Sequence, residues 1–245
     1  STRVRSSAAS DVYKRQFQGS VVVELATTTQ GAKIRYTLDG SEPTEESFLY
    51  KHPFSLNKTT QVKARGFKEG YHPSRVLSII ALKAELKDAL SVHPVQNGVT
   101  YKYFEGNYQK VTDIEKTPLL RTGVLSKPSI QGASRTDHFG YIFSGLIKVP
   151  ENGVYTFQTS SDDGSVLYID NELVVNNDGS HAAIPATGFI ALEKGFHSYK
   201  LYYFEDYEGE HLSWAWKLPS AETLVPIPSS CLLYTSPSPR DISGS

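Results

Sequence analysis

The stretch Leu167-Tyr168-Ile169-Asp170-Asn171-Glu172-Leu173-Val174-Val175 predicts a β-hairpin. Two short apolar runs flank Asp170-Asn171, and a two-residue loop of this composition favours the tight turn that joins antiparallel strands. The cluster Ser161-Asp162-Asp163-Gly164 stands just before the first run, and its residue types are those of turns. The hairpin therefore follows a polar loop in a region of antiparallel sheet.

Short β-rich runs continue on both sides of this hairpin, through residues 97–228. Gly, Asn, Asp and Pro occur in almost every connection between them. We expect a larger antiparallel β-sandwich here. Its expected strands cover residues 101–105, 141–149, 153–159, 165–169, 172–175, 188–192, 196–204 and 212–218.

A smaller set of strands is predicted in residues 17–81. In residues 33–38 the apolar side chains of Ile34, Tyr36 and Leu38 fall at every second position, which places them on one face of a strand. Further runs precede and follow this one, and we expect a small antiparallel β-sandwich. The fold class is therefore all-β, with two β-sandwiches in series. The other expected strands cover residues 21–25, 54–56, 60–67 and 75–81.

The pattern changes in residues 82–96, where Leu82, Leu86 and Leu90 recur at intervals of four before His93 and Pro94. Spacing of four residues is typical of one face of a helix, and proline ends a helix. This segment predicts a short helix or an irregular linker between the domains.

The sequences at the two ends of the chain are related through the DNA that encodes them. This relation indicates that both ends are translated from added DNA and are not parts of a natural protein. Asp11 to Gln16 can be encoded by GAT GTG TAT AAG AGA CAG, and the reverse complement of these codons, read one base out of phase, gives Cys231 to Ser236. Such an inverted repeat resembles sequencing-adapter DNA. We expect residues 1–16 to be an artefactual, disordered tail and residues 231–245 to be a second artefactual tail. A chance match beside a natural Ser/Pro-rich end is the alternative.

Composition excludes several classes of function. The chain has 245 residues, is 39% hydrophobic and 21% charged, and carries a formal charge of -1. It has no basic block for nucleic acid, and no apolar run long enough to span a membrane. The single cysteine, Cys231, falls in the tail, so neither a disulfide framework nor a thiolate ligand is expected.

The familiar enzyme signatures are absent from the sequence: G-x-S-x-G, H-E-x-x-H, the P-loop and G-x-G-x-x-G between strand and helix. A glycosidase needs only two suitably spaced carboxylates, and Glu105, Glu205 and Asp206 remain candidates. Acidic residues in β-rich domains are more often solvated than catalytic. We therefore expect no catalytic residue in this chain.

Residues 34–44, with the string I-R-Y-T-L-D-G-S-E-P-T, resemble the chitobiase/β-hexosaminidase C-terminal domain. Tyr50, Pro53 and residues 62–67 extend the resemblance over most of residues 17–81. It implies an Ig-like appendage of a glycoside hydrolase that has no catalytic residues of its own.

Residues 97–228 resemble the protective-antigen fourteen-kilodalton domain, a β-sandwich of toxins, adhesins and glycosidases. The matching segments are residues 101–106, 143–145 with Pro150, 153–157, 161–170, 176–181, 202–205 and Trp216. In lectin members of this family, two adjacent aspartates joined by a cis peptide bind calcium, and the ion bridges to sugar hydroxyls. Asp162 and Asp163 match these positions, so the resemblance implies a calcium-dependent carbohydrate site with both residues as metal ligands. The alternative is a turn in which both carboxylates accept backbone N–H groups.

The resemblance also implies helpers in neighbouring loops. Asn177, Asp178 and His181 follow the hairpin and are expected to contact carbohydrate, or else to form an Asx turn with a hydrogen-bonded histidine. Lectin members also take a ligand from a late loop, which matches residues 205–211. That loop lacks the expected asparagine, which weakens the calcium assignment.

Aromatic residues divide into core and candidate platforms. Trp214 and Trp216 lie two apart on one face of a strand, as in a core stripe. Tyr108, Phe139 and Tyr207 are expected in loops, where they would stack on sugar rings or pack against the loops.

Two functions follow from these expectations. The first is a non-catalytic accessory region of a secreted, periplasmic or cell-surface bacterial glycoside hydrolase, with glycan and an upstream catalytic domain as partners. The second is a purely structural module without a ligand, which would show an apolar patch rather than a concave polar pocket near Asp162.

Overall fold

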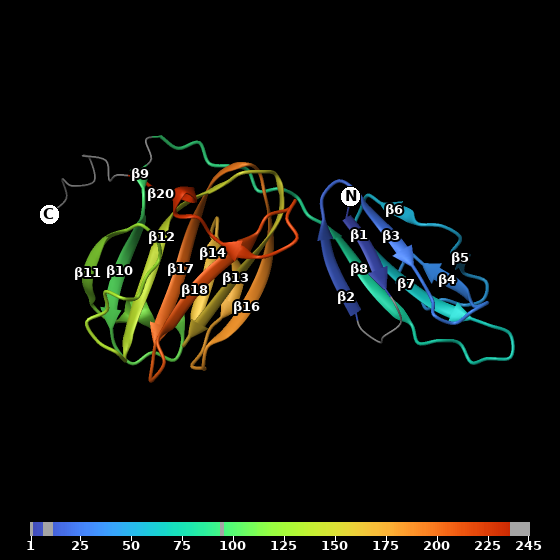
Figure 1. Ribbon diagram of the computed structural model, residues 1–245, viewed down its shortest axis with the longest axis horizontal. Coiled ribbons are helices and arrows are strands. Elements are labelled where there is room, and N and C mark those ends of the chain that lie inside the picture. Colours follow the sequence, from blue (N-terminus) through green and yellow to red (C-terminus); the bar gives the residue numbers. More distant parts are fainter. Residues whose placement is uncertain (1, 7–11, 94–95, 236–245) are drawn as a thin grey trace. The chain divides into compact units, whose positions relative to one another are not determined.

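The computed structural model describes residues 2–6, 12–93 and 96–235, and it is all-β (Figure 1). The chain divides into two compact units, Ser1–Glu85 and Leu86–Ser245. The helical elements of the described residues are two short 3-10 turns, η1 (Val111–Lys116) and η2 (Ser229–Cys231). The described part of the chain has no helix that is both long and apolar enough to cross a membrane.

The first unit contains a three-stranded sheet in the order β1-β3-β6 and a five-stranded sheet in the order β2-β8-β7-β4-β5. Val21 and Val23 from one sheet and Val62 and Ile79 from the other are almost completely buried in its core. This confirms a small β domain. Its strands are β1 (Thr2–Ser6), β2 (Val12–Phe17), β3 (Val21–Leu25), β4 (Lys33–Thr37), β5 (Phe48–Leu49), β6 (Phe54–Leu56), β7 (Thr60–Phe67) and β8 (Leu77–Lys83).

Both ends of the chain contain strands. In the segment where disorder was expected, β1 pairs in parallel with β3 and β2 pairs in parallel with β8, each at the edge of its sheet. Near the other end, β20 (Leu232–Tyr234) pairs with β12 (Phe139–Val149) and β9 (Gln96–Asn97). A sheet edge offers unpaired N–H and C=O groups to any extended segment beside it. This is a physical reason why strands form where a disordered tail was expected.

The segment between the domains contains no helix in its described residues. Instead, the backbone N–H of Lys87 donates to the carbonyl oxygen of Ala191 (2.9 Å), and that of Leu90 donates to Phe196 (2.8 Å). These bonds satisfy the backbone groups that a helix would have paired internally. The irregular alternative is the one observed.

The second unit has an eight-stranded sheet and a four-stranded sheet in the order β16-β13-β18-β19. The larger sheet follows the order β11-β10-β12-β17-β14-β15, and β20 and β9 join it beside β12. The remaining strands of this unit are β10 (Val99–Glu105), β11 (Leu119–Leu125), β13 (Gly153–Asp162), β14 (Ser165–Ile169), β15 (Glu172–Asn177), β16 (Ile184–Leu192), β17 (Gly195–Glu205), β18 (His211–Lys217) and β19 (Val225–Pro226).

The hairpin that opened the sequence analysis is present. Strands β14 and β15 are antiparallel, and both Asp170 (φ 49°) and Asn171 (φ 62°) have the left-handed backbone of a tight two-residue turn. Trp216 is buried and Trp214 packs against the same core, which confirms the core stripe. The face expected in residues 33–38 is only partly covered, since Leu38 is 38% exposed.

Candidate functional site

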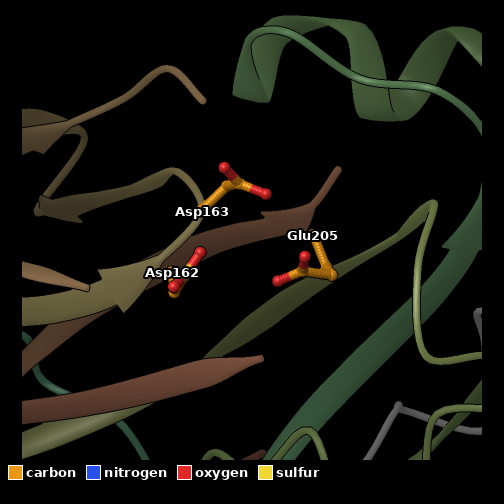
Figure 2. Close-up of side chains that lie close together, drawn as sticks. All are labelled: Asp162, Asp163 and Glu205. Carbon is orange, nitrogen blue, oxygen red and sulfur yellow. The ribbon is translucent and has the colours of Figure 1, made fainter. Parts of the chain in front are cut away.

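Three carboxylates gather at one end of the second unit (Figure 2). Asp162 is the last residue of β13 and Asp163 follows it, whereas Glu205 is the last residue of β17. Each residue offers one oxygen, and the three oxygens lie within 4.8 Å of one another. Strand β13 belongs to the four-stranded sheet and β17 to the eight-stranded sheet, so the cluster joins the two layers at this end.

Asp163 is buried and holds two loops together. Its Oδ1 accepts hydrogen bonds from the Ser180 hydroxyl (2.9 Å) and the His181 backbone N–H (2.8 Å). Its Oδ2 accepts from the backbone N–H groups of Asp206 (2.7 Å) and Tyr207 (3.3 Å). Four donors satisfy both carboxylate oxygens. The turn alternative from the sequence thus describes Asp163 well.

Asp162 has more capacity for a ligand. It is only partly buried, and its Oδ2 accepts one bond, from the Ala183 backbone N–H (3.1 Å). The peptide bond between Asp162 and Asp163 is cis. Burial and the negative charge of Asp163 raise the pKa of the Asp162 carboxyl above its ordinary value. Gly209 (φ 93°) passes so close that a Cβ there would lie 2.7 Å from Asp162 Oδ2.

Glu205 is completely buried, and its Oε1 has no hydrogen-bond partner. The Tyr203 hydroxyl lies 3.1 Å from its Oε2 and donates to the carbonyl oxygen of Asp162 (2.6 Å). Burial and the charge of Asp163 raise the pKa of Glu205 to about 8. A buried carboxyl oxygen without a hydrogen-bond partner destabilises the folded protein. A cation bound to Oε1 of Glu205 would compensate for this free-energy cost.

The donor set suits a hard divalent cation. Calcium binds carboxylate oxygens at about 2.3–2.6 Å, so two oxygens on one ion lie no more than about 5 Å apart. The 4.8 Å spread of the cluster meets this limit. Asp162 and Glu205 have oxygens available, whereas Asp163 would have to exchange one of its four donors. The cluster could therefore hold a divalent cation, with Asp162 and Glu205 offering the oxygens that have fewest hydrogen bonds.

The helper loop lies beside the cluster, but its side chains are engaged elsewhere. The Asn177 amide donates to the Ser161 hydroxyl (3.2 Å) and the Ile184 carbonyl (2.9 Å). Asp178 Oδ1 accepts from the backbone N–H groups of Val111 and Gly179, both at 2.9 Å. Of the three predicted helpers, His181 is the one with a hydrogen bond to the cluster among the described residues, and its backbone N–H is the donor. Its ring nitrogens lie 3.0 Å from the carbonyl oxygens of Asn177 and Ala182.

Two of the three aromatic candidates cannot meet a sugar ring. Tyr108 is 0% exposed and Phe139 is 1% exposed, because both pack inside the second unit, so the platform prediction is wrong for them. Tyr207 is 66% exposed and directly follows Asp206, whose backbone N–H binds Asp163. The backbone of Tyr207 therefore lies beside the carboxylates, and its side chain is open to solvent.

Glu205 was not singled out from the sequence as a partner of the aspartates. It appeared there as one of three candidate carboxylates, as the end of the matching segment 202–205, and as the first position of the late loop that supplies a ligand in lectin members. One sequence signal was available. Glu205 ends a long alternating strand at a buried position, and a buried acidic residue is uncommon unless it is paired or binds a ligand. Nothing in the local sequence shows that β17 and β13 end at the same place.

Two family models match the chain. Residues 12–78 match the chitobiase/beta-hexosaminidase C-terminal domain, and residues 95–229, more than half of the chain, match the PA14 domain. Both are accessory domains, and neither is a catalytic domain. The first match begins at Val12, within the predicted artefactual tail.

Among curated proteins, a beta-hexosaminidase of Porphyromonas gingivalis is 27% identical over 183 residues, which cover 71% of this chain. The chain spans only 23% of that relative's length. Homology to a beta-hexosaminidase is therefore distant.

Among solved structures, the PA14 domain of an antifreeze protein has a TM-score of 0.48 and 18% identity, covering 62% of this chain and 98% of that one. An epithelial adhesin 6 A domain from Candida glabrata, in complex with Galβ1-3GlcNAc, has a TM-score of 0.48 and 13% identity, covering 61% and 92%. The match of residues 95–229 to the PA14 model covers more than half of the chain, and so this chain belongs to the PA14 domain family, with a chitobiase/β-hexosaminidase C-terminal domain preceding the PA14 domain.

Proposed function

We propose that this chain is a non-catalytic accessory region of a secreted, periplasmic or cell-surface glycoside hydrolase, and that its PA14 domain binds carbohydrate at the Asp162, Asp163 and Glu205 cluster. One observation carries the proposal. Three carboxylates meet at the loop end of the sandwich, and one of their buried oxygens has no partner. Clusters of this kind are costly unless a ligand or cation compensates for them.

Calcium is the ion that the donor set suits best. Asp162 and Glu205 would hold it, and Asp163 would keep the surrounding loops in place. A bound calcium ion supplies coordination positions for a pair of sugar hydroxyls. Tyr207, exposed beside the cluster, would cover the apolar face of the sugar ring.

The parent enzyme is proposed to be β-hexosaminidase-like, with its catalytic domain elsewhere in the full protein. Two similarities support this. The first unit matches a domain named for chitobiase and beta-hexosaminidase, and the relative from Porphyromonas gingivalis carries the beta-hexosaminidase name. A binding domain attached to such an enzyme would raise the local concentration of catalytic domain on its polymer.

The test is binding of the full chain to a panel of immobilised oligosaccharides, with calcium and with a chelator. We expect at least one glycan to bind in calcium, and Asp162→Asn and Glu205→Gln to abolish that binding. The matched controls Asp88→Asn and Glu222→Gln change exposed carboxylates of the same unit and should bind as the parent chain does. Binding that survives both variants would contradict the assigned site.

A packing module without ligand is the competing function, and the four donors on Asp163 favour it for that residue. It predicts no retention on any glycan of the panel, with or without calcium. Retention that survives the chelator but not Asp162→Asn would keep the carbohydrate site and remove the metal.

A further inference from the structure

The first unit has a surface groove that neither the proposed function nor the family matches explain. Strand β5 is the edge strand beside β4 (Figure 1). The groove is lined by residues of these two strands and of the loop between them, and its volume is about 330 Å³. That is the lower end of the range for small-molecule sites, and it suits one or two sugar rings. The lining residues are Tyr36, Thr37, Leu38, Asp39, Glu46, Ser47 and Phe48.

One wall of the groove is aromatic and open to solvent. Phe48 is 64% exposed, and its ring centroid lies 5.6 Å from that of Tyr36. Tyr36 in turn stacks on Phe54 at 4.6 Å, which anchors the wall to the interior. The Phe48 ring is held in place by Tyr36 and is exposed to solvent on its other side. A sugar ring or a cation can stack on an aromatic face of this kind.

The loop that closes the groove is held in a fixed shape by its own hydrogen bonds. The Ser41 backbone N–H donates to Asp39 Oδ1 (3.0 Å), and the Thr37 hydroxyl donates to the Ser41 carbonyl (2.6 Å). The guanidinium of Arg35 donates to the Ser47 carbonyl (3.0 Å). A preformed loop has less conformational entropy to lose when a ligand binds.

The charge of the groove is negative. Hydrogen bonds from Ser41 hold the pKa of Asp39 below its ordinary value, so Asp39 is ionised at neutral pH. In the described part of the chain, the Glu46 side chain forms no hydrogen bond or ion pair, and neither does the Tyr36 hydroxyl. The lining residues include no Lys, Arg or His.

We propose that this groove binds a sugar ring that carries a protonated amine, the glucosamine unit of a de-N-acetylated glycan. The ring stacks on Phe48, and its ammonium group lies toward Glu46 and Asp39. An aromatic wall beside two carboxylates that form no ion pair in the described part of the chain complements a cationic, polyhydroxylated ring better than a neutral or anionic one. A lysine side chain also carries an ammonium group, but it has no ring that could stack on Phe48, so it should bind more weakly than the amino sugar.

The test is calorimetric titration of the full chain with a glucosamine trisaccharide, in chelator and in an Asp162→Asn background, so that the PA14 site contributes nothing. We expect Phe48→Ala and Glu46→Gln each to weaken binding by about fivefold or more, and high salt to weaken it as well. Both residues are exposed, so the variants should fold. The matched controls Tyr71→Ala and Glu45→Gln, exposed in the same unit but outside the groove, should leave affinity unchanged.

Three results would overturn the proposal. These are no measurable binding of the trisaccharide, equal binding of a neutral glucose trisaccharide or of a lysine peptide, or binding that Phe48→Ala leaves intact. None of them bears on glycan binding by the PA14 domain, which the Asp162→Asn background has already removed.

Discussion

The Asp163 carboxylate is expected to hold two loops of the PA14 domain together, and Asp163→Ala removes it. The substitution leaves the backbone N–H groups of His181, Asp206 and Tyr207, and the Ser180 hydroxyl, without their acceptor. A hydrogen bond to a charged group contributes about 1.5–3 kcal/mol when it is well buried. Several of these donors are at partly exposed positions where water replaces the acceptor, so about 1 kcal/mol each, or about 4 kcal/mol in total, is the expected loss.

Tryptophan fluorescence during urea unfolding measures this loss in one domain. Both tryptophans, Trp214 and Trp216, lie in the second unit, so the signal does not report on the first. The free energy of unfolding should fall by about 4 kcal/mol in Asp163→Ala and by less than about 0.5 kcal/mol in the exposed control Asp88→Ala. A loss below about 1 kcal/mol in Asp163→Ala would refute the role assigned to this carboxylate.

Two further predictions concern buried groups away from the cluster. Burial lowers the pKa of His197, but its hydrogen bonds to Asp170 and to a backbone carbonyl outweigh this and raise it. The stability from this pair is therefore complete below the unfolded pKa, near 6.5, and is lost as pH rises through the folded value. The tryptophan-monitored urea midpoint should fall between pH 6 and pH 9, and Asp170→Asn should flatten that slope; an unchanged slope would contradict the ion pair. A Cβ at Gly188 would lie 1.6 Å from the Val174 carbonyl oxygen, so Gly188→Ala should cost about 3 kcal/mol or more in the same assay, while Gly132→Ala, whose nearest neighbour is 3.7 Å away, should be nearly neutral.

Much of the fold was predictable because its signals are local. Asp170 and Asn171 favour a tight turn through their own backbone preferences, and the apolar run that precedes them places a strand beside it. Strand β11 was missed, since Leu119–Leu125 is an edge strand with exposed side chains and shows no buried stripe. For residues 82–96 the leucine spacing left a short helix or an irregular linker open, and the described residues form the irregular linker, because tertiary backbone bonds outweigh a weak helical pattern.

The part of the candidate site that is local in sequence was predictable, and the part that depends on tertiary structure was not. Asp162 and Asp163 are adjacent in sequence, so a motif identifies them together. Glu205 comes from another sheet, 42 residues after Asp163, and only the registers of β13 and β17 bring it there. Asn177 and Asp178 were expected either to contact carbohydrate or to belong to an Asx turn, and in the structure their side chains bind backbone and hydroxyl groups of neighbouring residues.

Carbohydrate binding at the carboxylate cluster is best tested by hydrogen–deuterium exchange of the full chain in the presence of calcium, with and without the strongest glycan from the panel. We expect slower exchange in peptides that cover residues 161–164, 178–183 and 205–211, the loops that meet at Asp162 and Glu205. Glu205→Gln should abolish this protection, whereas Glu222→Gln should retain it. Protection elsewhere on the PA14 domain, or none at all with the glycan demonstrably bound, would show that the carbohydrate site lies elsewhere.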